Sequence, residues 1–163
     1  MLVAFGTLVG CSASTEKKEY DVPKALCGVS MDRDLVSGFL PAGKKIDIQE
    51  KNPVPSRERC QVNIDGKVAL VASQEWWQKG DNITDVADAH PQLDSVQPTA
   101  NGTYVISGTG GVARAKSCTS PDHVDHVLYT AMQVYTPEQR DASAMKRLIT
   151  RYTKEVERSS KCQ

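Results

Sequence analysis

Thiol groups are the side chains of this sequence whose number and spacing most readily support chemistry. The five cysteines are Cys11, Cys27, Cys60, Cys118 and Cys162. No two form a CxxC pair, and no histidine lies at metal-ligand spacing from any of them, so a zinc site is not indicated. Cys11 ends an apolar run and stands apart from the other four. Four dispersed cysteines in an exported chain indicate two disulfides, with three connectivities open, whereas in a cytosolic chain they would be unrelated buried thiols.

The segment before Cys11 has the features of an export signal. Residues 1–10 are uncharged and apolar, and they are too short to cross a bilayer, which takes about 20 apolar residues. Leu8-Val9-Gly10-Cys11 is similar to a bacterial lipobox, in which the cysteine thiol accepts a diacylglyceryl group and a small preceding residue admits the peptidase. We therefore predict a signal peptide over 1–10 and lipidation of Cys11. The alternative is a buried first strand over residues 2–5.

The start of the sequence departs from this pattern in one respect. No basic residue precedes Leu2, so we expect the true start of the signal peptide to lie upstream. Residues 12–20 are small and charged without an apolar period, which predicts a flexible tether over 11–21. The folded domain is then expected over 22–163.

A glycine-rich run, Gly108-Thr109-Gly110-Gly111, invites comparison with phosphate-binding loops. It lacks the Walker lysine and the GxGxxG spacing, and no helix is expected after it. We interpret it as the turn of a hairpin between strands over 103–107 and 112–118.

Two groups of titratable residues invite comparison with metal sites. His123 and His126 lie beside aspartates, but i, i+3 spacing in a strand places the two rings on opposite faces of the sheet. The polar segment 78–102 contains Asp81, Asp85, Asp88 and His90. Their spacing is not that of an EF-hand. We predict no metal and no cofactor. No GxSxG motif is present, and an exported hydrolase with an unrecognised active site is the alternative function.

Trp76 and Trp77 are the only tryptophans and stand together at the end of a predicted strand. Neighbouring side chains of an extended chain point to opposite faces, so one indole can enter the core while the other faces solvent. An exposed tryptophan beside a polar loop can bind a ligand or a partner. The alternative is that both indoles pack beneath residues 78–102.

The elements that must position these residues begin with a short helix. Ser30 as N-cap and the aspartates that follow it predict a helix over 30–40, which Pro41 ends. Ile46 and Ile48 alternate with polar residues, which predicts a short, half-buried strand.

The clearest local signal is Asp65-Gly66 between two β-rich runs. Both turn residues of a type I′ hairpin need positive φ, which this dipeptide tolerates. The second run is apolar at every position from Val68 to Ala72, which places that strand in the centre of the sheet. Residues 124–135 are rich in β-branched and aromatic residues and predict another strand.

A long helix is predicted at the C-terminus. Thr136, Pro137 and Gln139 supply an N-cap, a proline at the first helical position and a capping-box glutamine. Its apolar stripe consists of Met145, Leu148, Ile149, Tyr152 and Val156. Its opposite face carries Arg140, Arg147, Arg151, Lys154 and Arg158. This basic face is either simply solvated or in contact with an anionic surface such as lipid headgroups or wall polymers.

These elements predict an α+β domain: an antiparallel sheet of about five strands, with a short N-terminal helix and a long C-terminal helix packed on it. Within it we predict the disulfides Cys27–Cys60 and Cys118–Cys162. The first joins the segment before the opening helix to the first hairpin strand, and the second ties the end of the last helix to the strand that ends at Cys118. Each closes a loop of about 35 to 45 residues.

The charge balance narrows the classes of partner. The sequence has 20 basic and 20 acidic residues and no formal net charge. Nucleic-acid binders usually carry a basic excess, so no nucleic acid is expected. An electrostatic partner would have to be met by a local patch.

Several short motifs follow one another along nearly the whole chain. They are a lipobox and polar tether, Leu26-Cys27-Gly28, Leu40-Pro41, a Cys-x-Val-x-x-Asp-Gly strand from Cys60 to Gly66, a mid-chain Cys118, and a final helix ending in Cys162. This layout resembles small secreted lipoproteins of actinobacteria. The resemblance implies a place on the extracytoplasmic face of the cell membrane, held by the lipid on Cys11. It carries over no catalytic residue. The Trp76–Trp77 pair, the polar segment 78–102 and the basic helix face instead favour a binding or accessory module of the cell envelope, with an envelope protein or an anionic surface as partner.

Overall fold

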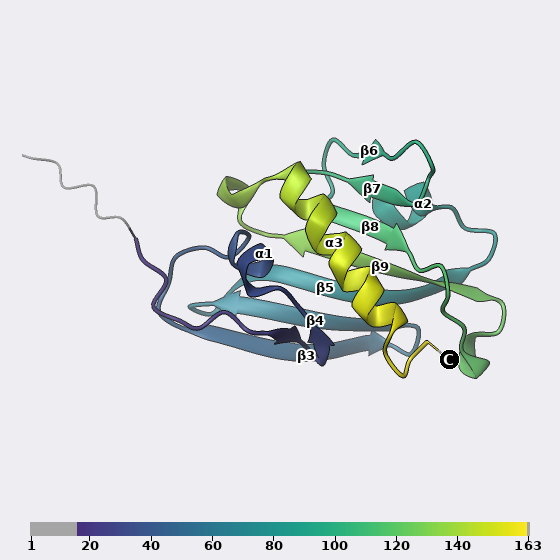
Figure 1. Ribbon diagram of the computed structural model, residues 1–163, viewed down its shortest axis with the longest axis horizontal. Helices are drawn as coiled ribbons and strands as arrows, with labels where there is room; N and C mark the ends of the chain where they lie inside the picture. Colours follow the sequence, from purple (N-terminus) through teal and green to yellow (C-terminus); the bar gives the residue numbers. More distant parts are fainter. Residues whose placement is uncertain (1–15, 163) are drawn as a thin grey trace, which may run out of the picture.

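The computed structural model describes residues 16–162. In it, one antiparallel sheet of seven strands has the order β3-β4-β5-β9-β8-β7-β6, and a separate two-stranded hairpin is formed by β1 and β2 (Figure 1). In chain order the elements are β1 (Ala25–Leu26), β2 (Val29–Ser30), α1 (Arg33–Ser37), β3 (Ile46–Val54), β4 (Arg57–Ile64), β5 (Lys67–Gln78), α2 (Ile83–Asp88), β6 (Gln97–Pro98), β7 (Tyr104–Ile106), β8 (Gly110–Arg114), the 3-10 turn η1 (Pro121–His123), β9 (His126–Val134), the 3-10 turn η2 (Pro137–Gln139) and α3 (Ala142–Glu157).

The mixed α and β architecture with a long C-terminal helix is confirmed. The sheet has more strands than the predicted number of about five, because the two-residue strand β6 extends it beyond β7 and the edge strand β3 is as long as its neighbours. The short N-terminal helix is present but spans only five residues, Arg33–Ser37.

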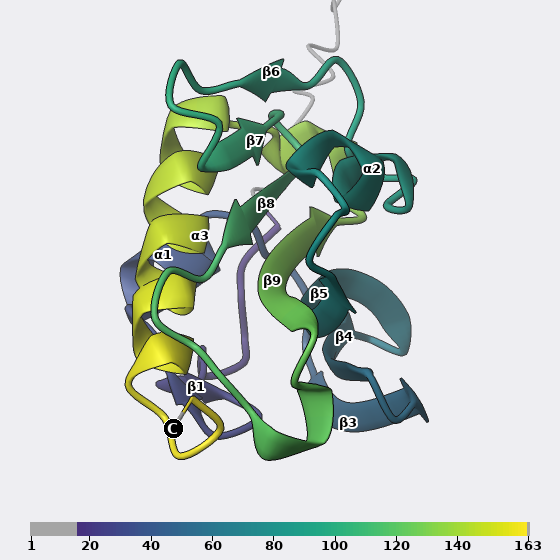
Figure 2. The ribbon, with the colours of Figure 1, turned by 90° about the vertical axis from the view of Figure 1, so that its right-hand side faces the viewer.

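The two faces of the sheet are covered by different elements. Figure 2 shows α3 on one side, together with α1, and α2 on the other. The predicted apolar stripe of α3 is fully buried against the first face, and its members are Met145, Leu148, Ile149, Tyr152 and Val156. A second apolar cluster lies beneath α2, and its members are Val86, Ala87, Val105, Val112, Tyr129 and Ala131. The core therefore consists of two apolar layers with the sheet between them.

The predicted hairpin is present at Asp65-Gly66. The φ angles of these residues are 49° and 79°, and Ile64 pairs with Lys67 across a two-residue turn. The central position of β5 is also confirmed, because it lies between β4 and β9 and is buried from Ala69 to Glu75.

A second tight hairpin was not expected. Cys27 and Gly28 have φ angles of 45° and 85°, and they join β1 to β2. Glycine accepts such angles readily, whereas cysteine rarely does. Cys27 is at the same time bonded to Cys60 of β4, and this bond fixes the hairpin against the sheet.

The first helix begins later than predicted. Ser30 belongs to β2, and Asp32 is the N-cap: its carboxylate accepts the backbone N–H groups of Asp34 at 2.9 Å and Leu35 at 3.3 Å. An aspartate at this position satisfies N–H groups that have no partner inside the helix. The helix ends at Ser37, before Gly38.

The last helix also has a different start. Residues Pro137–Gln139 form the separate turn η2, and the Thr136 hydroxyl donates to the Phe39 carbonyl at 3.2 Å instead of capping a helix. The N-cap of α3 is Asp141, whose carboxylate accepts the backbone N–H of Ala144 at 2.8 Å.

The strand predicted around Ile46 and Ile48 is longer and more exposed than expected. β3 continues through Pro53 to Val54, and nearly all its residues are exposed. An edge strand tolerates proline because one of its sides needs no hydrogen bonds. Its pairing with β4 shifts register between Lys51 and Val54.

The expected tether over 11–21 is wrong at its C-terminal end. The backbone of Lys17 and Glu19 pairs with Gly43, with Glu19 N–H donating at 2.8 Å, and the Tyr20 hydroxyl donates to the Pro41 carbonyl. Residues 17–20 are therefore part of the folded body. The predicted signal peptide over 1–10, Cys11 and the rest of the tether lie outside the described residues.

Candidate functional site

Trp76 and Trp77 lie near the end of β5 and contact different layers of the core. Trp76 packs against the cluster beneath α3, and Trp77 packs against the cluster beneath α2. Both side chains are half-buried. The expectation of one buried and one solvent-exposed indole is therefore wrong, because each face of the sheet has its own cover at this point.

A groove of about 400 Å³ lies beside Trp76. Three segments form its walls: the β4 and β5 ends, residues 119–123, and the chain after α3. The polar side chains that line it are Ser56, Glu58, Gln74, Thr119, Ser120, Asp122, His123, Ser160 and Lys161. We call it the Trp76 groove. Hydroxyl, amide, carboxylate and ammonium groups thus surround a single indole.

The imidazole of His123 stacks on the Trp76 ring, with centroids 4.9 Å apart and planes 17° apart. His126 meets His123 edge-on at 5.6 Å. The prediction that these two histidines point apart is wrong, because His123 belongs to η1 and the extended chain begins only at His126. Within residues 16–162, no three His, Cys, Asp or Glu side chains are grouped as a metal site would require.

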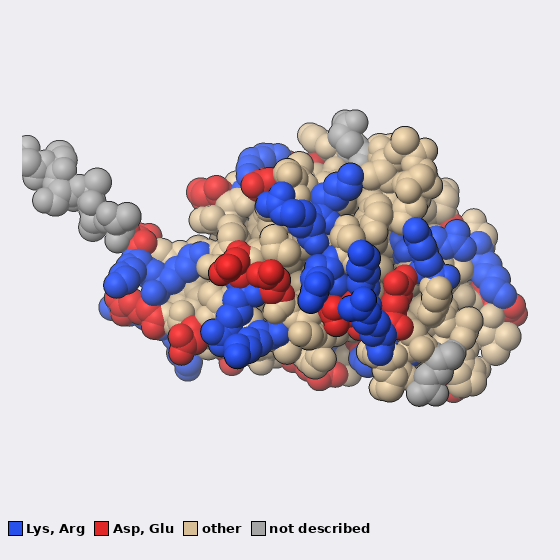
Figure 3. Space-filling view, viewed as in Figure 1, with Lys and Arg blue, Asp and Glu red and all other residues tan. Residues whose placement is uncertain are grey.

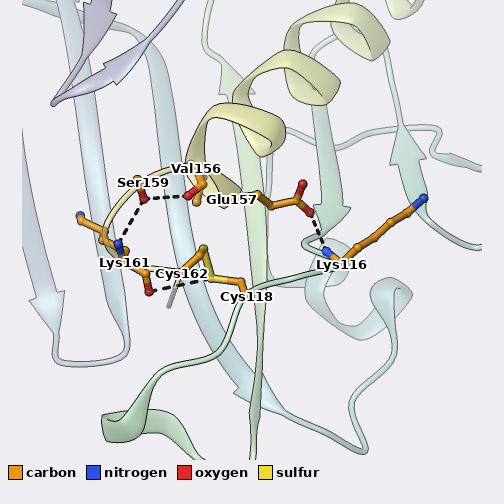
Figure 4. Close-up of a disulfide and its surroundings, with 7 residues drawn as sticks. All are labelled: Lys116, Cys118, Val156, Glu157, Ser159, Lys161 and Cys162. Carbon is orange, nitrogen blue, oxygen red and sulfur yellow. Dashed lines mark hydrogen bonds between the residues drawn. A yellow bond between two sulfur atoms is a disulfide. The ribbon is translucent and has the colours of Figure 1, made fainter.

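The C-terminal wall of the groove is held by the disulfide Cys118–Cys162, one of the two predicted pairs (Figure 4). Its Cα atoms are 4.3 Å apart. Beside it, the Ser159 hydroxyl donates to the Val156 carbonyl at 2.7 Å, which folds the chain back after α3. Lys161 then reaches across to β4 and forms an ion pair with Glu58. The disulfide therefore holds the Lys161 ammonium group against the Glu58 carboxylate at this side of the groove.

On the opposite face of β5, Glu75 is a buried carboxylate that the sequence reasoning missed. Its side chain has Arg57 Nε 3.2 Å from Oε1, and the Trp77 indole N–H donates to Oε2 at 3.1 Å. His90 Nε2 lies 3.5 Å from Oε2, which is an ion-pair distance without hydrogen-bond geometry. Burial would raise the pKa of Glu75, but the neighbouring His90, Arg57 and Trp77 outweigh it and lower that pKa.

The Glu75 side chain is almost fully withdrawn from solvent, although Glu75 and Arg57 line a pocket of about 470 Å³ on this face. Ser73 projects from the same face of β5 as Glu75, since the two are two residues apart in a strand. Ser73, Glu75 and His90 are 0%, 1% and 2% exposed. They therefore offer no accessible nucleophile, and we assign the cluster a structural role. Its sequence signal was a single acidic residue between the apolar run Val68–Ala72 and the two tryptophans of the same strand.

Two acidic residues of the polar segment, Asp81 and Asp85, bind backbone N–H groups. Asp85 completes a capping box with Asn82 at the start of α2, and the Asp81 carboxylate accepts the backbone N–H of Gln78 at 3.0 Å. The helix that these caps begin, α2, spans Ile83–Asp88.

The predicted hairpin is present, but its turn is shorter than the glycine-rich run: Gly108 and Thr109 lie in the turn, whereas Gly110 and Gly111 begin β8 and pair with β9. Its glycines are required by close packing: a Cβ on Gly110 would lie 2.4 Å from Leu93 Cδ1 and 2.8 Å from the Met132 carbonyl oxygen. A Cβ on Gly111 would approach Ile149 of α3 to 3.3 Å. These glycines let the segment before β6 and the helix α3 approach the sheet from its two sides.

The predicted basic face of α3 is exposed. Arg147, Arg151, Lys154 and Arg158 all face solvent. The Glu155 carboxylate forms ion pairs with the guanidinium groups of Arg151 at 3.4 Å and Arg158 at 3.0 Å. The Arg147 guanidinium donates to the Ser143 hydroxyl at 3.0 Å. The C-terminal end of this face approaches the Trp76 groove, because Arg158 is only two residues before Ser160, which lines the groove.

None of the helices formed by residues 16–162 is long and apolar enough to span a membrane. Comparison of the chain with protein-family models, curated proteins and solved structures finds no match.

Proposed function

We propose that this protein is a lipoprotein of a bacterial cell surface that binds a glycan-like ligand in the Trp76 groove. The support for export is the lipobox-like Leu8-Val9-Gly10-Cys11 together with two disulfides, which persist in oxidising compartments. The diacylglyceryl group on Cys11 supplies the membrane contact.

In this proposal, the lipid-anchored N-terminal segment and the ligand-binding Trp76 groove lie at opposite ends of β5. Lys17 and Glu19, at the start of the described chain, pair with Gly43, next to the segment whose backbone binds the Asp65 carboxylate. Trp76 lies at the other end of β5 (Figure 1). Nine residues of strand at about 3.3 Å each separate Lys67 from Trp76 by roughly 30 Å. A ligand can therefore reach the groove while the opposite end is held at the membrane.

The chemistry of the groove fits a polyhydroxylated ligand. A sugar ring presents a C–H face that packs on an aromatic surface, here the stacked rings of Trp76 and His123, and its hydroxyl groups bind side chains that both donate and accept. Ser120, Gln74 and Glu58 offer hydroxyl, amide and carboxylate groups around Trp76. This combination beside one indole is the observation that carries the proposal.

The binding experiment uses tryptophan fluorescence. The protein is titrated with a panel of soluble neutral and acidic oligosaccharides, and ligands that shift the emission are followed by their dissociation constants. Trp76→Ala should weaken binding by at least tenfold, whereas Trp77→Phe, on the other face of β5, should leave it within about twofold. The proposal fails if no oligosaccharide binds or if the two variants lose affinity equally.

The anchor is tested separately in the producing cell. Cys11→Ala should move the protein from the membrane fraction to the medium or block its processing, because the thiol that accepts the lipid is absent. Fully processed Cys11→Ala protein that stays in the membrane fraction would contradict the anchor.

A further inference from the structure

A second groove, of about 410 Å³, lies between α1 and α3. The residues that line it are Asp32, Leu35, Lys146, Arg147, Thr150, Arg151 and Lys154. We call it the α1–α3 groove. Figure 3 views the molecule from the side of α3, where lysine and arginine side chains gather along the helix.

Positive charge dominates this groove. Four of its lining side chains are cations and one is a carboxylate. That carboxylate, Asp32, already accepts two backbone N–H groups at the start of α1. Arg151 shares Glu155 with Arg158, so a single acid serves two guanidinium groups. The groove therefore carries an excess of cations that a ligand with several negative charges would neutralise.

The floor of the groove is less polar than its rim. Leu35 and Thr150 are half-buried between the two helices, whereas Lys146 and Lys154 are exposed. Long basic side chains can lay their methylene stems over apolar surface and keep the charged end in the polar layer. An apolar floor with a cationic rim complements the boundary between phosphate groups and glycerol esters at a bilayer surface.

The anchored end of the chain lies next to this groove. The Lys18 ammonium donates to the hydroxyl of Ser37, the last residue of α1, at 3.1 Å. The seven residues from Cys11 to Lys18 span at most about 25 Å when fully extended. A lipid on Cys11 would therefore hold the α1–α3 groove within reach of the same bilayer.

We propose that the α1–α3 groove binds the anionic phospholipid headgroups of the membrane that holds the protein. The guanidinium groups of Arg147 and Arg151 can bind phosphate oxygens in bidentate fashion, and Lys146 and Lys154 add to the attraction. The contact holds α1 and the adjacent turns of α3 at the bilayer, on the face of the sheet opposite α2 (Figure 2). It rests on the proposed function only for the presence of the anchor.

The experiment measures vesicle binding without the anchor. All proteins are the full chain with Cys11→Ser, so no acyl group can attach and the N-terminal segment contributes equally to each. The groove variant carries Lys146→Gln, Arg147→Gln, Arg151→Gln and Lys154→Gln. A matched control removes four exposed cations elsewhere, with Lys51→Gln, Lys79→Gln, Arg114→Gln and Lys116→Gln. Co-sedimentation is measured with phosphatidylglycerol-containing vesicles and with pure phosphatidylcholine vesicles, at low and high salt.

The parent protein should bind the anionic vesicles at least tenfold more tightly than the groove variant, and the control should stay close to the parent. Binding should fall with salt, because exposed charges are screened over about 8 Å at physiological ionic strength.

Equal binding of parent and groove variant, or an equal loss in the control, would overturn the proposal. So would groove-dependent binding of a soluble glycerol phosphate polymer with no binding of anionic vesicles, which would assign the groove to a wall polymer. If the groove variant does not fold, Lys154→Glu alone should lower anionic binding. The assay uses no lipidated Cys11 and no Trp76 variant, so its outcome is independent of the tests of the proposed function.

Discussion

The imidazole of His90 lies 3.5 Å from the carboxylate of Glu75, and both side chains are buried between β5 and the segment that follows α2. Arg57 completes the group from β4. Removing one member of such a group leaves the others as unpaired buried polar or charged groups, which is far costlier than losing an exposed ion pair. The cluster therefore joins two strands of the sheet to the segment that covers them.

The first prediction concerns acid stability. Because its folded-state pKa is lowered, Glu75 binds protons less readily in the folded protein than in the unfolded chain, whose pKa is near the ordinary 4.5. Its stabilising contribution is present above pH 4.5 and is lost as the pH falls through the lower folded-state value. Urea unfolding followed across this range should show a declining free energy of unfolding on the acid side, with a smaller decline in Glu75→Gln.

The same variant tests the size of the effect near neutral pH. Glu75→Gln leaves Arg57 and His90 without a carboxylate and should lower the free energy of unfolding by about 3–5 kcal/mol. Glu138→Gln, at an exposed glutamate of η2, is the control and should change it by less than about 0.5 kcal/mol. Equal effects of the two substitutions would show that the cluster contributes little.

The strand register explains why the cluster was not predicted. Counting outward from the Asp65-Gly66 turn without interruption would pair Glu75 with Ser56. A bulge between Val62 and Asn63 shifts the register by one residue, so that Arg57 pairs with Glu75. Hairpins with a strong turn signal could be read from sequence, but a bulge depends on how both strands fit their neighbours in the sheet.

The first residues of α1 and α3 and the Trp76 groove could not be predicted for a similar reason, because all of them depend on contacts between segments far apart in the sequence. Ser30 and Thr136 are good capping residues by type, yet tertiary contacts assign them to β2 and to a bond with the Phe39 carbonyl. The groove needs η1, the β5 end and the chain after α3 to come together, and no local pattern indicates that meeting. The apolar stripe of α3 was predictable because its period depends on the helix alone.

The second prediction concerns the disulfide beside the groove. Replacing both Cys118 and Cys162 with serine opens a loop of sequence separation 44 and should cost about 3–4 kcal/mol in the free energy of unfolding. It should also weaken ligand binding in the groove, because Lys161 loses the tie that places it against Glu58. Peptide mapping under non-reducing conditions should first show the Cys27–Cys60 and Cys118–Cys162 peptides. A Cys27–Cys118 or Cys60–Cys162 peptide would contradict both the pairing and this prediction.

The last prediction separates the two faces of α3. Leu148 is fully buried against the sheet, so Leu148→Ala should lower the free energy of unfolding by about 2–5 kcal/mol through lost contacts and the cavity left behind. Arg151 lies on the exposed face and pairs with Glu155 one turn later, so Arg151→Ala should cost less than about 0.5 kcal/mol. Chemical denaturation of both variants against the parent protein gives the comparison. If Arg151→Ala destabilised the protein as much as Leu148→Ala, the basic face would be needed for folding, and the glutamine variant of the α1–α3 groove could not report on membrane binding alone.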